Sequence, residues 1–474
     1  MNTEFDSTAD RVVIIGGGPG GYEAALVAAQ LGADVMLIEA NRCGGSAVLT
    51  DVVPSKSLIA TAEMMDEIER SGGLGIRIEN AEDTESGDRR VTADLEAVNK
   101  RILSLADAQA NDIYEGLIRA GVKVIQGRAT LAGRDQVHVV ESGGTEYTLE
   151  ASTILLSVGA HPRELPTAQP DGERILTWTQ LYDLDELPEH LIVVGSGVTG
   201  AEFASAYRAV GTEVTLVSSR EKVLPGQDED AADVLEFVFR NKGMNVLSRS
   251  RAASVTRTDD GVEVVLADGR RVEGSHCLMA VGSIPNTEGL GLEKAGVRVS
   301  ESGHIVVDGV SRTSRAGIYA AGDCTGVLPL ASVAAMQGRI AMNHALGDAV
   351  QPLKLRNVAS NVFTAPEIAT VGFTQQNYRE NPTDIDTVML PLDTNPRAKM
   401  LGIEDGFVKI FARRGSGSIL GGVVVGPRAS ELILPITMAV ENRLTVDQLS
   451  ASFVVYPSVS GSLTEAARKL HRHL

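Results

Sequence analysis

The sequence predicts an α/β fold in which two strand–helix–strand units are followed by an α+β module. At two places, residues 11–39 and 191–217, a β-branched run leads into a glycine-rich turn and an alanine-rich helical stretch. Each stretch ends in a second apolar run, which completes a βαβ pattern. From Gln351 onward the pattern changes to strands followed by a helix. These observations indicate two similar units and one of a different kind.

The first βαβ unit carries the motif Gly16-x-Gly18-x-x-Gly21 between a strand at Arg11–Gly16 and a helix. Glycines at this spacing let the backbone approach a pyrophosphate, whose charge is met by N–H groups at the helix N-terminus. The next strand, Val35–Glu39, ends on a carboxylate that is placed to accept hydrogen bonds from ribose hydroxyls. We therefore expect a Rossmann-like dinucleotide site here, rather than a turn that only allows close packing.

The second βαβ unit repeats the design with Gly195-x-Gly197-x-x-Gly200 after the strand Leu191–Val194. The position equivalent to Glu39 is Ser218, which is followed by Ser219 and Arg220. A carboxylate at this point would repel a 2′-phosphate, whereas hydroxyls and a guanidinium bind one. The alternative is an ordinary polar loop. We expect this unit to accept NADPH, with NADH as a second coenzyme.

The remaining elements connect and extend these units. Apolar spacing predicts a long amphipathic helix over residues 94–120, closed by Gly121. Alternating stretches near residues 122–140 and 261–272 predict small antiparallel sheets. The C-terminal module is expected to hold strands at residues 408–414 and 419–426 and a helix at 429–441.

Composition limits the partners and the compartment. The net charge of −19 over 474 residues argues against nucleic acid or an anionic membrane as the main partner. Three cysteines (Cys43, Cys277 and Cys324) suit a reducing cytoplasm and structural thiols. No apolar run approaches the ~20 residues of a membrane span. The polar first ten residues predict a frayed tail, and His344, His471 and His473 show no metal-ligand spacing.

Residues Gly44–Lys56 read Gly-Gly-Ser-Ala-Val-Leu-Thr-Asp-Val-Val-Pro-Ser-Lys. The stretch resembles the redox segment of the flavoprotein disulfide reductases, the family of dihydrolipoamide dehydrogenase, which has cysteines where this chain has Ala47 and Val52. Ile318–Gly326 resembles the second FAD motif of that family, and Ser157–Ala160 and Gly282–Asn286 match two further segments more loosely. The resemblance implies that FAD is bound by residues of these segments: Gly45, Ser46, Lys56, Gly159, Gly282 and Asp323.

The resemblance also separates the two half-reactions. It implies that Lys56 pairs with Glu202 beside flavin N5, where an ammonium stabilises the charge that develops as hydride arrives. Disulfide reduction in the family uses a histidine and a glutamate from the partner subunit, and here Tyr456 and Gly461 stand at those positions. A phenol is a poor substitute for an imidazole. The resemblance therefore implies an intact NAD(P)H half-reaction and no thiol chemistry.

The resemblance extends from end to end. It implies an FAD-binding domain (1–155 and 276–350), an NAD(P)H-binding domain (156–275) and a dimerisation domain (351–474), in a homodimer where Tyr456 faces the flavin of the partner. Family members without the cysteine pair resemble actinobacterial NAD(P)H:quinone reductases, so we expect a small-molecule quinone as electron acceptor. Two alternatives stay open: a soluble pyridine nucleotide transhydrogenase, and a non-catalytic flavoprotein that acts as a scaffold or redox sensor.

Overall fold

The structure is a computed structural model that describes residues 10–76 and 91–471. The predicted frayed tail before residue 10, and His473, lie outside the described residues. Within them the chain forms two compact bodies. Body 1 comprises residues 10–55, 100–163 and 282–354, and body 2 comprises 56–76, 91–99, 164–281 and 355–471. The division into three functional domains remains a prediction.

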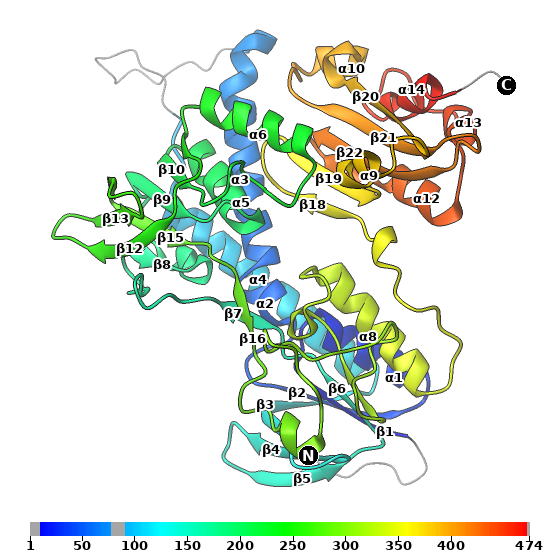
Figure 1. Cartoon of the computed structure of the whole chain (residues 1–474). Helices are drawn as coiled ribbons and strands as arrows, with labels where there is room; N and C mark the ends of the chain where they lie inside the picture. The colour runs from blue at the N-terminus through cyan, green and yellow to red at the C-terminus, as the bar shows by residue number, and fades with distance from the viewer. Residues whose placement is uncertain (1–9, 77–90, 472–474) are drawn as a thin grey trace. The chain divides into compact units, whose positions relative to one another are not determined.

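Body 1 is built on a seven-stranded sheet with the strand order β17-β6-β1-β2-β3-β4-β5 (Figure 1). Strands β17, β6, β1, β2 and β3 run parallel, and β4 and β5 extend the sheet antiparallel. The strands are β1 (Arg11–Ile15), β2 (Asp34–Glu39), β3 (Lys123–Leu131), β4 (Gln136–Glu141), β5 (Glu146–Glu150), β6 (Thr153–Leu156) and β17 (Ile318–Ala320). A separate pair joins β7 (Ala160–Pro162) to β16 (Ser283–Pro285).

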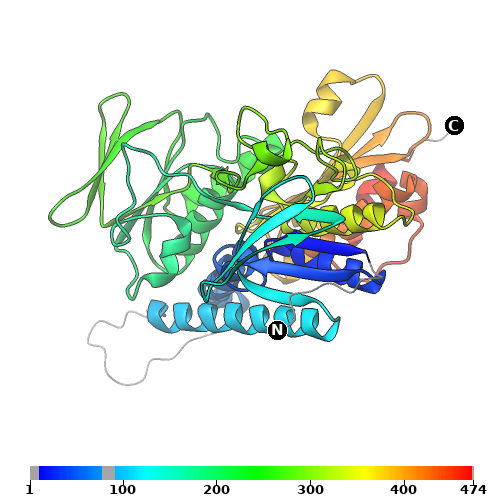
Figure 2. The same ribbon diagram turned by 90° about the horizontal axis from the view of Figure 1, so that it is seen from below.

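Helices cover one face of this sheet. Successive residues of each strand point to opposite faces, so every strand contributes side chains to two separate clusters. Val12 and Ile14 pack with the alanines of α1 (Pro19–Gln30), whereas Val13 and Ile15 belong to the cluster on the other face. Helix α8 (Ala331–Ala345) contacts α1 where two glycines meet: a Cβ on Gly338 would lie 2.1 Å from the carbonyl oxygen of Gly20. The C-terminal end of α4 (Leu95–Arg119) joins the same cluster, and Figure 2 shows the helix alongside the sheet.

The predicted helix end at Gly121 is confirmed. Gly121 has a φ of +83°, and the N–H of Val122 donates to the carbonyl oxygen of Leu117 at 3.0 Å. This is the left-handed cap that glycine adopts at low cost. Body 1 also contains α2 (Gly45–Leu49), α7 (Leu292–Ala295) and the 3₁₀ turn η3 (Asp323–Thr325).

Body 2 contains the second βαβ unit in a five-stranded parallel sheet of order β11-β10-β9-β15-β8. Its elements are β8 (Ile175–Leu176), β9 (His190–Val194), α5 (Val198–Ala209), β10 (Glu213–Val217), α6 (Glu229–Asn241), β11 (Asn245–Leu247) and β15 (His276–Met279). An antiparallel sheet of β12 (Ala252–Arg257), β13 (Val262–Leu266) and β14 (Arg271–Gly274) confirms the predicted small sheet. Helix α3 (Val52–Arg70) begins at the end of body 1 and continues in body 2, followed by η1 (Ser71–Leu74).

The C-terminal module of body 2 is an antiparallel sheet of order β18-β19-β22-β21-β20 with short helices. Its strands and helices are β18 (Ser360–Val362), β19 (Glu367–Gly372), α9 (Gln375–Glu380), β20 (Ile385–Pro391), α10 (Pro396–Met400), β21 (Phe407–Arg413), β22 (Ile419–Gly426), α13 (Val446–Ser450) and α14 (Gly461–Lys469). The module also contains the 3₁₀ turns η4 (Leu355–Asn357) and η5 (Leu392–Thr394), and a further 3₁₀ turn, η2 (Trp178–Asp183), lies elsewhere in body 2. The predicted helix at 429–441 is divided into α11 (Ala429–Leu432) and α12 (Leu434–Asn442). Pro435 accounts for the break because it has no N–H to continue the helix and is tolerated only in a first turn. Among the described residues, no helix is both long and apolar enough to cross a membrane.

Candidate dinucleotide sites

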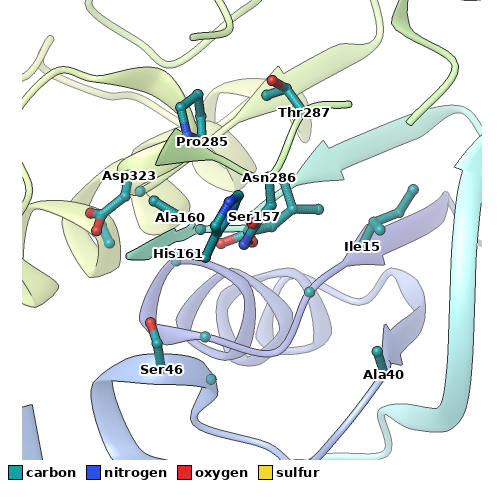
Figure 3. A pocket seen from close by; sticks show the side chains of 18 of the residues that line it. Ile15, Ala40, Ser46, Ser157, Ala160, His161, Pro285, Asn286, Thr287 and Asp323 are labelled. Carbon is teal, nitrogen blue, oxygen red and sulfur yellow. Dashed lines mark hydrogen bonds between the residues drawn. The ribbon is translucent and has the colours of Figure 1, made fainter. Parts of the chain in front are cut away.

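A cavity of about 950 Å³ lies in body 1 at the carboxyl ends of β1, β2 and β6 (Figure 3). Ligands of open parallel sheets bind at this edge, where the loops after the strands diverge. Residues predicted to bind FAD line the cavity: Gly16, Gly18, Glu39, Gly45, Ser46, Gly159 and Asp323. Gly282 does not line it; its carbonyl oxygen accepts the N–H of Arg163 at 2.9 Å in the adjoining turn.

Glycine is required at the floor of the cavity because other backbone lies against it. Gly16 has a φ of +98°, and a Cβ there would lie 2.2 Å from the carbonyl oxygen of Ser157. A Cβ on Gly21 would lie 1.9 Å from the carbonyl oxygen of Gly16, and one on Gly45 would lie 2.8 Å from the Cα of Gly18. Gly18 is the N-cap of α1, so the first turn of the helix opens on the cavity. This arrangement fits a pyrophosphate.

Glu39 is held by the backbone on both carboxylate oxygens. Oε2 accepts the N–H of Gly17 at 2.6 Å and Oε1 accepts the N–H of Asn41 at 2.8 Å. Each carboxylate oxygen has a second lone pair, so hydroxyl groups in the cavity can still donate to Glu39. The sequence-based role of Glu39 as a ribose acceptor fits this geometry.

Asp323 offers a second acceptor on the cavity wall. No hydrogen bond to its carboxylate from the described residues is present, although the side chain is half-buried. Burial raises the pKa of Asp323, and His304 opposes this shift. A half-buried carboxylate without donors is suited to accept hydroxyl groups from a ligand. Together with the glycine floor, Asp323 makes the cavity a fit for FAD.

Two cavity residues were not predicted as ligands from the sequence. His161 of β7 and Asn286, which follows β16, meet at 2.6 Å between Nδ1 and Oδ1, and Figure 3 shows their side chains next to each other. The sequence signal was present for Asn286, since it ends the segment Gly282–Asn286. No motif marked His161, because its role depends on the pairing of two strands more than 120 residues apart.

The second glycine motif, in body 2, repeats the construction of the first. Gly195 has a φ of +116°, and a Cβ there would lie 2.1 Å from the carbonyl oxygen of Ala280. A Cβ on Gly200 would lie 1.9 Å from the carbonyl oxygen of Gly195. Gly197 is the N-cap of α5, and a Cβ at this position would have no heavy atom of the described residues within 4 Å. The turn is therefore open at Gly197, where a pyrophosphate would approach.

The three residues after β10 differ in exposure. Ser218 is fully buried, and its Oγ lies 2.7 Å from the Oγ of Ser196. Ser219 and Arg220 are exposed. Among the described residues, no acceptor pairs with the guanidinium of Arg220. The backbone N–H of Arg220 donates to Ser218 Oγ at 3.2 Å. Ser218 thus orders the turn, and Arg220 is the group that can meet a ligand.

Lys56 and Glu202 form an ion pair in body 2, at 2.8 Å between Nζ and Oε2. Glu202 is 4% exposed, and its Oε1 accepts the N–H of Phe363 at 2.8 Å. The Lys56 ammonium also lies over the ring of Phe363, 4.8 Å from its centroid. The structure therefore joins the starts of α3 and α5 to the segment after β18. The ion pair that the sequence predicts between Lys56 and Glu202 is present, and Phe363 is a third residue in contact with it.

Tyr456 is on the surface of the C-terminal module, where it is 82% exposed. Its neighbours Phe453 and Val455 are also exposed, at 106% and 77%. Gly461 begins α14. The described residues of this chain alone thus leave an apolar segment uncovered.

The three cysteines are buried and unpaired. Burial raises the pKa of Cys43 to about 11 and that of Cys324 to about 12, and it raises the pKa of Cys277 in β15 further. Thiols in this state are weak nucleophiles, because the reactive form is the thiolate. The interpretation of all three as structural thiols agrees with these surroundings.

Comparison with known proteins gives the same architecture. Residues 10–338 match the model of the pyridine nucleotide-disulphide oxidoreductases, and residues 358–467 match the dimerisation domain of these proteins. The chain is 54% identical to an NAD(P)H dehydrogenase (quinone) of Mycobacterium tuberculosis, covering 98% of this chain and 94% of that protein. It is 32% identical to a dihydrolipoyl dehydrogenase of Zymomonas mobilis, covering 96% of each. The crystal structure of LpdA from M. tuberculosis superposes with a TM-score of 0.92 at 53% identity, covering 98% of this chain and 100% of LpdA. The matches confirm the expected family: the chain belongs to the pyridine nucleotide-disulphide oxidoreductases.

Proposed function

We propose that the chain is an FAD-dependent NAD(P)H:quinone oxidoreductase without disulfide reductase activity. The observation that carries the proposal is that Ala47 and Val52, which replace the two cysteines, line the cavity. Neither side chain accepts electrons, so the acceptor has to be a diffusible molecule. An apolar wall suits a flat quinone. The relative named NAD(P)H dehydrogenase (quinone) supports the same class of acceptor.

FAD would be held by the glycine floor, Glu39 and Asp323. When bound, FAD supplies the electron relay, taking hydride at N5 and delivering two electrons to the quinone. The N–H groups of the first turn of α1 would hold the pyrophosphate, and the carboxylates of Glu39 and Asp323 would accept hydroxyl groups. Absorbance of the purified protein near the flavin bands tests the assignment, and a colourless protein that takes up no FAD would contradict it.

Lys56 is assigned to the hydride step. Glu202 and the ring of Phe363 hold its ammonium in one position. Lys56 follows Val52 by four residues in α3, so both are on the same face of the helix, and Val52 lines the cavity. A fixed cation on this face would stabilise the negative charge that accompanies hydride arrival. We expect Lys56→Met to slow flavin reduction by NADPH about 100-fold, with little change in the amount of bound FAD.

The coenzyme is assigned to the second glycine motif, with Arg220 as the contact for a 2′-phosphate. A charge-assisted hydrogen bond is worth about 1.5–3 kcal/mol, so Arg220→Ala should raise KM for NADPH at least about tenfold and leave KM for NADH nearly unchanged. Arg240→Ala is a matched control, since Arg240 is paired with Glu236 on the exposed face of α6. Equal changes of KM for both coenzymes would show that Arg220 does not contact the phosphate.

We infer that the working form is a homodimer. The match to a dimerisation domain and the uncovered apolar segment at Phe453, Val455 and Tyr456 support this inference. In the dimer Tyr456 would face the flavin of the partner subunit. Phe453→Asp should shift the protein toward the monomer in analytical ultracentrifugation, and a wild-type protein that is monomeric at micromolar concentration would contradict the inference.

A cytoplasmic location is also inferred. The three buried, unpaired cysteines suit a reducing compartment. Cell fractionation tests this, and recovery of the protein outside the cytoplasm would contradict it.

An acceptor panel distinguishes the proposed reaction from its alternatives. NADPH and NADH oxidation would be followed with menadione, with thio-NAD and with lipoamide. The proposal predicts fast turnover with menadione. Lipoamide turnover of comparable rate would overturn it, and fast thio-NAD reduction with weak quinone activity would favour a transhydrogenase. A flavin-loaded protein that reduces none of the three would act as a scaffold or sensor.

A further inference from the structure

The described wall of the FAD cavity carries more carboxylates than cationic side chains. Its described lining includes four carboxylates: Glu39 from β2, Asp51 between α2 and α3, Glu288 after β16 and Asp323 from η3. The described lining includes one guanidinium, that of Arg128 from β3. His161 is the remaining lining side chain that can take up positive charge. Its protonation therefore matters to an anionic ligand.

The contacts of Asn286 determine which nitrogen of His161 carries the proton. Asn286 Nδ2 donates to the carbonyl oxygen of Val158 at 2.8 Å, and its backbone N–H donates to the carbonyl oxygen of Gly159 at 3.0 Å. The amide is thus oriented with Oδ1 toward His161, at 2.6 Å from Nδ1. Because Oδ1 only accepts, Nδ1 of His161 has to donate. The neutral ring then has its lone pair on Nε2.

Nε2 is the atom left for a ligand. No described residue forms a hydrogen bond with it, and the ring is exposed on the cavity wall. A neutral Nε2 presents a lone pair, which repels a phosphate oxygen, whereas a protonated Nε2 presents a charged donor. The nearest cation along the chain, Arg163, is turned to the carbonyl oxygen of Ser283 at 3.3 Å. His161 is thus the lining side chain that can become a charged donor to an anionic ligand.

Resting on the FAD assignment above, we propose that His161 donates from Nε2 to the diphosphate of FAD and takes up one proton when FAD binds. Asn286 is the positioning residue that holds the ring in the required tautomer. FAD retention is then stronger at low pH, where the proton is present on the ring, and weaker at high pH.

The test uses the holoenzyme and the release of its flavin, which is measured by the rise of flavin fluorescence after dilution. At about pH 6, His161→Gln should release FAD about tenfold faster than wild type, because it lacks the charged donor; at about pH 8 the two rates should be similar. His161→Lys, with a permanent charge, should release FAD slowly at both pH values. His138→Gln, a partly exposed histidine of β4 that does not line the cavity, should match wild type.

Each other result contradicts the proposal. Equal release from wild type and His161→Gln at both pH values would show that His161 does not contact FAD. A faster release by the same factor at both pH values would mean that neutral Nε2 accepts a hydroxyl group instead. Circular dichroism of each variant establishes that the fold is intact. A wild-type protein that contains no FAD would overturn the FAD assignment itself, whereas a loaded protein with flat pH dependence would overturn only the role of His161.

Discussion

Replacing Lys409 by methionine should strongly destabilise body 2. Lys409 is 2% exposed on β21, and its Nζ donates to both oxygens of Asp228, at 2.7 and 2.9 Å, and to Asp230 at 2.5 Å. Val408, Ile410 and Ala412 point to the core on the other face of the strand, so Lys409 alternates with them. The ion cluster of Lys409, Asp228 and Asp230 therefore links the start of α6 to the C-terminal module within body 2.

The size of the expected loss of stability depends on which buried charges remain after the substitution. Methionine keeps the apolar stem of the side chain but removes the cation, which leaves Asp228 as a buried charge without its partner. Breaking a buried ion pair in this way costs about 3–5 kcal/mol. In the double variant Lys409→Met/Asp228→Asn no buried charge is left, and asparagine still accepts the N–H groups of Asp230 and Ala231 as the N-cap of α6. The double variant should regain most of the lost stability.

Urea denaturation followed by tryptophan fluorescence provides the assay. Trp178 is the single tryptophan of the chain and is buried in body 2, so its emission reports on the body that holds Lys409. Lys222→Met is the control, because Lys222 forms an exposed pair with Asp233 and such pairs contribute about 0–1 kcal/mol. If Lys409→Met lowers the free energy of unfolding no more than Lys222→Met does, the buried ion cluster does not contribute the expected stability.

The remaining predictions concern the two glycine motifs, Glu39 and His276. Gly195→Ala should destabilise the fold, because its Cβ would lie 2.1 Å from a carbonyl oxygen, whereas Gly197→Ala should fold normally with a raised KM for NADPH; equal melting temperatures would refute the difference. Glu39→Ala should lower the FAD content of the purified protein, since two backbone N–H groups lose their acceptor, and full occupancy would count against its role. Burial lowers the pKa of His276 to about 4, so the unfolded chain binds its proton first and stability falls as the pH drops from about 6.5 toward 4. His276→Gln should lose less stability than wild type over that range in pH-dependent melting, and a parallel loss would assign the effect to other groups.

The sequence predicted much of the fold because local signals agreed with it. Both βαβ units begin and end within a few residues of their predicted bounds, and the helix that ends at Gly121 has the cap that its sequence indicates. Glycine spacing is a strong signal because at Gly16 and Gly195 only a residue without Cβ avoids the adjoining backbone. The C-terminal helix differs from the expected single helix because Pro435 occupies the first turn of a new helix after Ile433.

The sequence by itself therefore determined the family, the two dinucleotide motifs, the loss of the cysteine pair and the pairing of Lys56 with Glu202. Each of these rests on residues at set spacings within short motifs. The tertiary structure alone decided three other features: Ser218 is buried against Ser196, Phe363 completes the Lys56 cluster, and His161 meets Asn286 on the cavity wall. These features depend on which strands pair and which side chains become buried, and long-range packing sets both.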